Sequence, residues 1–333
     1  MNRRDLLKLS ALAAASGAAP LLSSSVFAQA KSAAPKELRV DYAYYSPTSL
    51  VLKKFGWLEE AVKPNGTEVK WVLSAGSNRA LEYLGGDSID FGSTAGLAAL
   101  LARANGNPIK SVYIYSRPEW TALAVAKDSP IQKITELKGK KIAATKGTDP
   151  YLFLLRSLSQ VGLHKNDVEI VHLQHADGRI ALERGNVDAW AGLDPHLAAS
   201  ELEAGSRIIY RNVNFNTYGF LNVSEKFAAA HPDQIPVVIK AYERARQWAI
   251  ANPAELAKLL AEESKLSLAV AERQLKRTDL SNPLIGAEHR DALQSAAPIL
   301  TEEALVKPGT DLSKVLAGLI DPAFAQRAGV RSA

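Results

Sequence analysis

The sequence of 333 residues contains no cysteine. It can therefore form no disulfide, no thiolate metal site, no cysteine nucleophile and no lipid-modified N-terminal cysteine. Long runs of like charge are also missing, and the formal net charge is only +5. A chain balanced in this way argues against a nucleic-acid partner and against a polybasic membrane patch.

Common motifs of catalysis and nucleotide binding are missing as well: G-x-S-x-G, G-x-x-x-x-G-K-[ST], H-E-x-x-H and G-x-G-x-x-G. His172 and His175 form an H-x-x-H pair, but strand spacing places them on opposite faces without a third ligand. Asp90 and Asp188 each precede a short expected strand, where a carboxylate readily accepts backbone N–H groups. We therefore predict no catalytic residue, no metal site and no cofactor.

The N-terminus is typical of a secretory signal peptide. Residues 1–8 are basic, residues 9–22 are mildly apolar, and Ala28-Gln29-Ala30 offers a small-x-small cleavage site. The apolar run is too short and too weak to remain as a membrane span. Arg3-Arg4 resembles a twin-arginine export signal, with an ordinary Sec signal as the alternative. Both routes predict a free periplasmic protein, cleaved after Ala30.

What the chain does contain is 47% hydrophobic residues and a regular alternation of strand and helix patterns. This alternation predicts an α/β fold with mostly parallel sheets and helices on both faces. The pattern pauses near residues 117–120, resumes, and becomes helical after residue 219. We expect a lobe at 119–218 inserted into a discontinuous lobe at 31–118 and 219–333, with C-terminal helices in the latter. Two crossing strands, near 117–121 and 215–219, then form a hinge that lets the lobes close on a ligand.

One stretch, residues 84–96, organises the first half of this pattern. Gly85 and Gly86 are expected to take the left-handed backbone that ends a helix, and Ile89 and Phe91 alternate as in a buried strand. Ser93 or Thr94 is expected to cap the next helix. A weaker copy at residues 185–192 indicates that the two lobes are built alike.

Loops rich in Ser, Thr and Gly recur where strands lead into helices. In an open α/β sheet such loops gather at the carboxyl ends of the strands, where ligands bind. Helix N-termini and hydroxyl groups there favour an anion, and neutral donors suit a strong-acid anion such as a sulfonate. For any single residue the alternative is that it only caps its own helix. The predicted ligand-binding residues of these loops are Ser46, Ser74, Gly76, Ser93, Thr94, Gly147 and Thr148.

Three further residues are predicted at the cleft. Trp120 lies at the expected hinge, and Asp194 follows the second copy of the motif. Trp190, within that copy, either stacks on an organic tail or fills the core of its lobe.

At these residues the chain resembles the periplasmic binding proteins of aliphatic sulfonate ABC importers, within the nitrate/sulfonate/taurine family. The matching segments are residues 90–94, 129–131, 137–139, 185–190, 194–195 and 231–232. The resemblance implies a type II two-lobe binding fold and, as partners, a small organosulfur anion and a membrane permease with its ATPase. It also implies that Ser93, Thr94, Thr148 and Trp190 surround the sulfonate group.

The chain departs from this pattern at Asp149-Pro150, because an acidic side chain is unfavourable beside an anion. Aliphatic sulfonates are therefore the leading expectation, with taurine, aryl sulfonates, sulfate esters and nitrate as alternatives. A monomer is expected. Two other classes of protein stay open, an enzyme on the same scaffold and a sensor that docks on a membrane receptor.

Overall fold

The computed structural model describes residues 33–331, so the predicted leader and its cleavage site lie outside the described residues. Within this part of the chain, none of the helices combines the length and the apolar character that crossing a membrane requires. The same residues contain no group of three or more His, Asp or Glu side chains placed to hold a metal ion.

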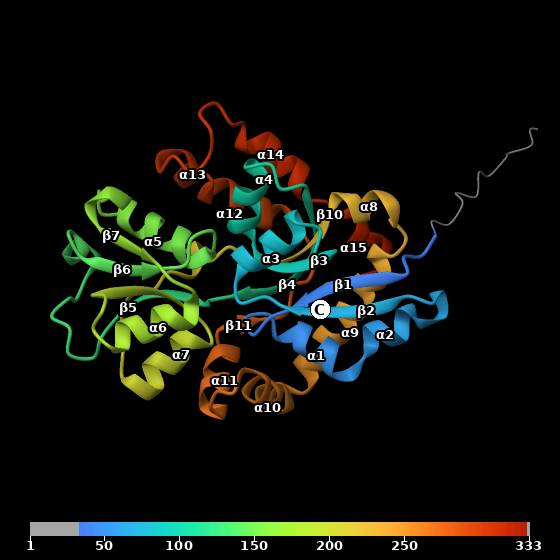
Figure 1. Cartoon of the computed structure of the whole chain (residues 1–333), viewed down its shortest axis with the longest axis horizontal. Helices are drawn as coiled ribbons and strands as arrows, with labels where there is room; N and C mark the ends of the chain where they lie inside the picture. The colour runs from blue at the N-terminus through green and yellow to red at the C-terminus, as the bar shows by residue number, and fades with distance from the viewer. Residues whose placement is uncertain (1–32, 332–333) are drawn as a thin grey trace, which may run out of the picture. The chain divides into compact units, whose positions relative to one another are not determined.

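The strands form two sheets of the same design (Figure 1). The first has the order β11-β4-β10-β3-β1-β2 and the second the order β7-β6-β8-β5-β9. In each sheet one antiparallel strand, β10 or β5, lies between neighbours that run the other way. Strands of the first sheet are β1 (Glu37–Tyr42), β2 (Glu68–Leu73), β3 (Phe91–Ala95), β4 (Ile109–Pro118), β10 (Gly219–Ser224) and β11 (Thr278–Asp279). Strands of the second are β5 (Thr121–Val125), β6 (Lys141–Ala144), β7 (Glu169–His172), β8 (Ala189–Leu193) and β9 (Arg207–Tyr210).

Helices cover both sheets; in Figure 1 α5 lies above the second sheet and α6 and α7 below it. Helices that follow strands of the first sheet are α1 (Pro47–Phe55), α2 (Trp57–Val62), α3 (Ser77–Gly85), α4 (Gly96–Ala104) and α8 (Glu225–Ala230). Those of the second sheet are α5 (Asp149–Ser159), α6 (His175–Glu183) and α7 (His196–Ala199). The C-terminal helices are α9 (Ile235–Ala251), α10 (Pro253–Ser264), α11 (Leu268–Leu275), α12 (Ala287–Ala296), α13 (Pro298–Glu302), α14 (Leu312–Leu319) and α15 (Ala323–Arg327).

The predicted likeness of the two halves is confirmed, but the sheets are mixed rather than mostly parallel, because β10 and β5 each pair antiparallel on both edges. The chain also does not become helical directly after residue 219, since β10 occupies Gly219–Ser224. Strands β3, β5 and β8 bury every residue, as central strands covered on both faces do. The aspartates of the two motif copies also make equivalent hydrogen bonds. Asp90 accepts a hydrogen bond from the Arg39 N–H at 2.8 Å, and Asp188 accepts one from the Lys141 N–H at 2.8 Å. Each carboxylate thus fixes the neighbouring parallel strand, which confirms the turn role predicted for both.

Two details of the organising stretch were wrong. Asp87, with φ of 56°, takes the left-handed backbone, and Gly86 does not. Ser93 and Thr94 do not cap α4, because β3 continues through both and pairs with Leu221 and Phe220 of β10. The strand is longer than predicted because it has ladder partners on both edges, and Ala95 becomes the N-cap residue of α4.

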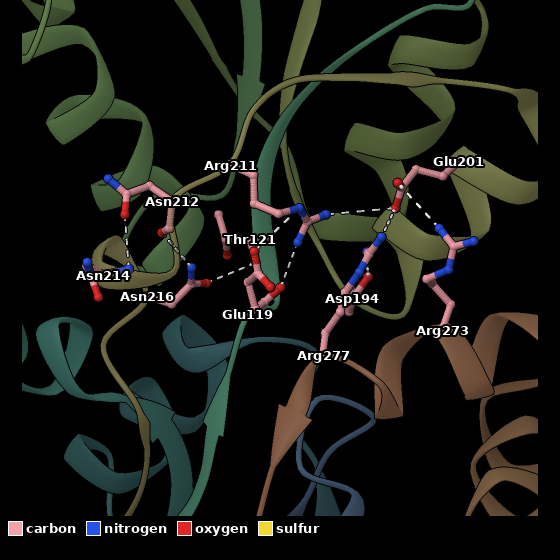
Figure 2. Close-up of polar contacts among 10 residues, drawn as sticks. All are labelled: Glu119, Thr121, Asp194, Glu201, Arg211, Asn212, Asn214, Asn216, Arg273 and Arg277. Carbon is pink, nitrogen blue, oxygen red and sulfur yellow. Dashed lines mark hydrogen bonds and ion pairs between the residues drawn. The ribbon is translucent and has the colours of Figure 1, made fainter.

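Two segments connect the sheets. Only Glu119 and Trp120 separate β4 from β5, and residues 211–218 lead from β9 to β10. The segments are tied together, since the Thr121 N–H donates to Asn216 Oδ1 at 3.0 Å (Figure 2). The lobe boundaries at 118/119 and 218/219 stay a prediction.

Candidate functional site

An enclosed pocket of about 200 Å³ lies at the carboxyl ends of four parallel strands. Tyr44, Tyr45, Ser74 and Ala75 line it after β1 and β2, and residues 174–176 and 193–196 line it around the ends of β7 and β8. This is the place where open α/β sheets bind their ligands. We refer to it below as the enclosed pocket.

Two helices begin at this pocket without a side-chain cap. Gly76 is the N-cap residue of α3 and Gln174 that of α6, and neither helix has a side-chain hydrogen bond at its N-terminus. The two ends approach closely, because a β-carbon on Gly76 would lie 2.9 Å from His175 Nε2. First-turn N–H groups of a helix have no partner within the helix, and they carry partial positive charge. Two such ends facing each other are suited to an anion.

The predicted hydroxyl residues differ in what they offer. Ser74 lines the enclosed pocket, while Ser46 is fully buried with an Oγ that makes no hydrogen bond within the described chain. Ser93 is fully buried behind Asp41, to which its N–H donates at 2.8 Å. Ser74 is therefore the predicted hydroxyl best placed to meet a ligand.

Thr94 and Thr148, both predicted to bind the ligand, have hydroxyl groups that form hydrogen bonds within the described chain. Thr94 Oγ1 accepts from Asn222 Nδ2 at 2.7 Å and donates to the Ala95 carbonyl at 3.1 Å. Thr148 Oγ1 donates to the Thr145 carbonyl at 2.6 Å. Gly147, next to Thr148, instead lines a wider groove of about 900 Å³ together with Asn78 and Gln174. Gln174 borders the groove and the enclosed pocket alike.

Trp190 fills the core of the second sheet, so its predicted place in the cleft is wrong. Its side chain is fully buried in a cluster with Ala122, Ala124 and Leu182. Its Nε1 lies against Gly178 of α6, where a β-carbon would be only 2.6 Å away. Gly178 thus makes room for the indole beneath α6.

Trp120 and Asp149 act together at the connecting segments. Trp120 Nε1 donates to Asp149 Oδ2 at 3.0 Å, and its ring meets Tyr45 edge to face at 6.0 Å. Asp149 also accepts from the Thr217 N–H at 3.0 Å and the Thr217 hydroxyl at 2.6 Å. Burial raises the pKa of Asp149, and these hydrogen bonds oppose that rise. The carboxylate that departs from the resembled pattern is therefore occupied by Trp120 and Thr217.

Asp194 lines the enclosed pocket, as predicted for the cleft, and belongs to an ion-pair network (Figure 2). Arg277 lies 3.3 Å from Asp194 and 2.6 Å from Glu201, and Arg273 and Arg211 reach Glu201 at 3.8 and 4.0 Å. Burial raises the pKa of Asp194 to about 6, against the effect of Arg277 and Arg211. Arg277 follows α11, so the C-terminal segment supplies a counter-charge at the edge of the pocket.

Asp41, a residue absent from the predicted site, lies behind Ser74. Burial raises the pKa of its carboxyl to about 7, although the hydrogen bond from the Ser93 N–H favours the ionised form. Asp41 sits at the end of β1, on an ordinary strand pattern, and no sequence signal separates it from a solvent-facing strand residue. His175 was noted in the sequence only as half of an H-x-x-H pair.

Replacing Asp41 with asparagine should stabilise the chain, increasingly so as pH rises from about 4 to about 7. Below this window the carboxyl is protonated in both the folded and the unfolded chain, so its burial as a charged group does not lower the free energy of unfolding. Within it only the unfolded chain ionises, so folding stability falls, by about 4 kcal/mol in all for the shift from 3.8 to about 7. Urea unfolding of both proteins between pH 4 and 8 measures the difference. A difference that does not change with pH would contradict the assignment.

The first sheet contains the strand order β2-β1-β3-β10-β4, and the second has the equivalent order β7-β6-β8-β5-β9. This shared order defines a type II periplasmic binding protein fold, together with the two segments that connect the sheets and the pocket at the strand ends. Solved structures agree. The alkanesulfonate-binding protein SsuA from Xanthomonas axonopodis pv. citri bound to MOPS has a TM-score of 0.78 and 28% identity, covering 84% of this chain and 98% of that one. The periplasmic aliphatic sulphonate binding protein SsuA from Escherichia coli has a TM-score of 0.74 and 29% identity, covering 87% and 93%.

The chain belongs to the family described as NMT1/THI5 like, which matches residues 51–256. A relative from Escherichia coli (strain K12), provisionally named an aliphatic sulfonates-binding protein, is 32% identical over 297 residues. The match spans 88% of this chain and 92% of the relative. The family resemblance expected from the sequence is therefore confirmed.

Proposed function

We propose that this chain binds a small organosulfur anion, an aliphatic sulfonate, in the enclosed pocket. It delivers this ligand in the periplasm to the permease and ATPase of an ABC importer, as a monomer that breaks no bond. The leader, cleaved after Ala30, exports it. The observation that carries the proposal is the meeting of two uncapped helix N-termini, of α3 and α6, at one enclosed pocket.

The donors for the anion are the first-turn N–H groups of α3 and α6 and the hydroxyl of Ser74. Gly76 lets the two helix ends approach, and Gly147 forms the adjoining groove. Ser46 and Ser93 lie behind this layer, and Trp120 supports Tyr45 at the wall. Thr94, Thr148 and Trp190 have no part in the proposal.

The carboxylate of Asp194 would repel an anion if it stood alone in the wall of the pocket. Arg277 pairs with it at 3.3 Å and is itself only 12% exposed, so the pair presents little net charge. Attraction between the lobes through Arg277 and Glu201 also favours the closed arrangement around the ligand. The network therefore makes a carboxylate compatible with an anion site.

The size of the pocket favours a short ligand. Pockets for drug-sized ligands enclose roughly 300–1,000 Å³, whereas the enclosed pocket measures about 200 Å³. Short alkanesulfonates and taurine fit this size better than aryl sulfonates do. The names of the relatives also support an aliphatic sulfonate as the ligand, since each name refers to the binding of aliphatic sulfonates or alkanesulfonates.

Thermal unfolding with a panel of anions tests the proposal. A ligand at a thousand times its Kd adds about 4 kcal/mol to the free energy of unfolding, so short sulfonates should raise Tm clearly. Nitrate, sulfate, an aryl sulfonate and a sulfate ester form the comparison set. If none of the organosulfur anions raises Tm, the proposed function is wrong.

A further inference from the structure

His175 is the most deeply buried titratable side chain of the enclosed pocket that belongs to no ion pair. It is 1% exposed, it opens α6, and its ring lies between the first turn of α3 and Thr145 of the second sheet. Burial, with a smaller effect of His196, lowers the pKa of His175 to about 3, so the imidazole is neutral. The question is which ring nitrogen carries the proton.

Thr145 fixes the tautomer of His175. The Thr145 hydroxyl donates to the Leu173 carbonyl at 2.7 Å, and a carbonyl oxygen can only accept. The single hydroxyl proton is therefore used, so the contact of 3.1 Å between Thr145 Oγ1 and His175 Nδ1 requires the proton on Nδ1. Nε2 is left with a lone pair and acts as an acceptor.

This acceptor has no donor within the described chain. Nε2 is buried and makes no hydrogen bond there. Leaving a buried acceptor unsatisfied is unfavourable, and a neutral imidazole with this pKa does not gain a proton at ordinary pH. The Oε1 of Gln174 is also buried without a partner, but an amide can turn its NH₂ group to the same place. Among the described side chains that line the enclosed pocket, His175 thus combines an acceptor without a partner and a ring that Thr145 holds in a fixed orientation.

We infer that His175 Nε2 accepts a hydrogen bond from the ligand, and that the ligand is a short sulfonate carrying an N–H or O–H donor on its carbon chain. This inference rests on the proposed function and narrows its substrate class. The anion meets the helix N-termini and the donor meets His175. Asp194, on the same pocket, does not separate the two kinds of donor, because Arg277 pairs with its carboxylate at 3.3 Å. Aminoalkanesulfonates and hydroxyalkanesulfonates are then the preferred classes, and plain alkanesulfonates the weakest.

Calorimetry with three matched ligands tests this order: 2-aminoethanesulfonate, 2-hydroxyethanesulfonate and propanesulfonate. We expect the wild type to bind the two donor-bearing ligands at least tenfold more tightly than propanesulfonate, as one hydrogen bond to a buried acceptor allows. His175→Leu should bring this ratio close to one while changing the affinity for propanesulfonate less than threefold. His196→Leu, which removes a histidine from the same pocket, should alter all three affinities by the same factor and preserve the ratio.

Thr145→Ala provides an independent test that leaves the His175 ring in place. Without the hydroxyl, Nδ1 loses its acceptor and the proton can move to Nε2, so the preference for donor-bearing ligands should fall here too. A wild-type ratio near one would mean that water serves Nε2, and it would overturn the inference. The inference would also be overturned if His175→Leu kept the wild-type preference for donor-bearing ligands, or if it weakened the binding of all three ligands equally. Sulfonates binding without discrimination would leave the proposed function intact, whereas no binding of any sulfonate would overturn both.

Discussion

Replacing Gly76 with alanine is expected to weaken sulfonate binding at least tenfold while leaving the fold intact. A β-carbon at this position would lie 2.8 Å from Asn78 Oδ1 and 2.9 Å from His175 Nε2. The imidazole cannot swing aside freely, because its Nδ1 is bonded to Thr145. The start of α3 and the start of α6 must therefore separate, and an anion between them loses contact with at least one set of N–H groups.

The backbone of Gly76 does not itself require glycine. Its φ of 168° is extended, and other residues adopt this conformation without strain. Any effect of Gly76→Ala on binding therefore comes from the contacts of the β-carbon with Asn78 and with His175 at the start of α6. Gly286→Ala is the matched control, because Gly286 is also a helix N-cap residue and a β-carbon there meets nothing within 4 Å. The general cost of alanine at an N-cap is common to both variants. Equal affinities for the two variants, measured by calorimetry, would contradict the account of the pocket.

Asp149→Ala is expected to lower the free energy of unfolding by about 3–5 kcal/mol, the range for breaking a buried charged network. The change removes the acceptor of three donors, the Trp120 indole, the Thr217 N–H and the Thr217 hydroxyl. Each donor is buried, so each is left unsatisfied at a cost. Trp120 and Thr217 lie on the two segments that connect the sheets. The start of α5 would therefore also lose its hydrogen bonds to both segments.

Urea unfolding of the ligand-free protein measures this effect. Asp128→Ala, at an exposed aspartate of the same half of the chain, should change stability by less than about 0.5 kcal/mol. Asp149→Asn should lie between the two, since the amide keeps one acceptor oxygen but turns a donor towards the others. Similar midpoints for Asp149→Ala and Asp128→Ala would contradict the role assigned to Asp149.

The fold could be predicted from the sequence because its signals are local. Alternating apolar residues mark the strands, and the two motif copies place Asp90 and Asp188 where a strand begins. Both carboxylates then bind the next parallel strand, as the turn interpretation required. The extent of β3 was mispredicted because it depends on β10, which joins the sheet from more than a hundred residues further along the chain.

The candidate site was predicted less well because the local sequence around a hydroxyl or aromatic side chain does not reveal which residues that side chain contacts in the fold. Thr94 resembles a helix cap in the sequence, yet Asn222 of β10 occupies it. Trp190 resembles a cleft residue in the sequence, yet it packs in the core, where Gly178 of α6 leaves room for its indole. Arg277 could not be predicted from spacing, since only the tertiary fold brings the end of α11 to the pocket. His175 follows β7 as closely as Gly76 follows β2, and it was missed because it was interpreted only as half of an H-x-x-H pair. Ser74, Gly76 and Asp194 could be predicted as candidates because they lie just after strands that end at the pocket.

Anomalous diffraction from sulfur tests the central claim most directly. Met1 is the single sulfur-containing residue of the chain, so in a crystal free of sulfur-containing buffer the sulfonate supplies any other sulfur signal. Crystals grown with 2-aminoethanesulfonate should show one peak in the enclosed pocket, within hydrogen-bonding reach of the first turns of α3 and α6 and of Ser74. A peak in the wider groove beside Lys146, or beside Ser93 and Thr94 away from the pocket, would contradict the account.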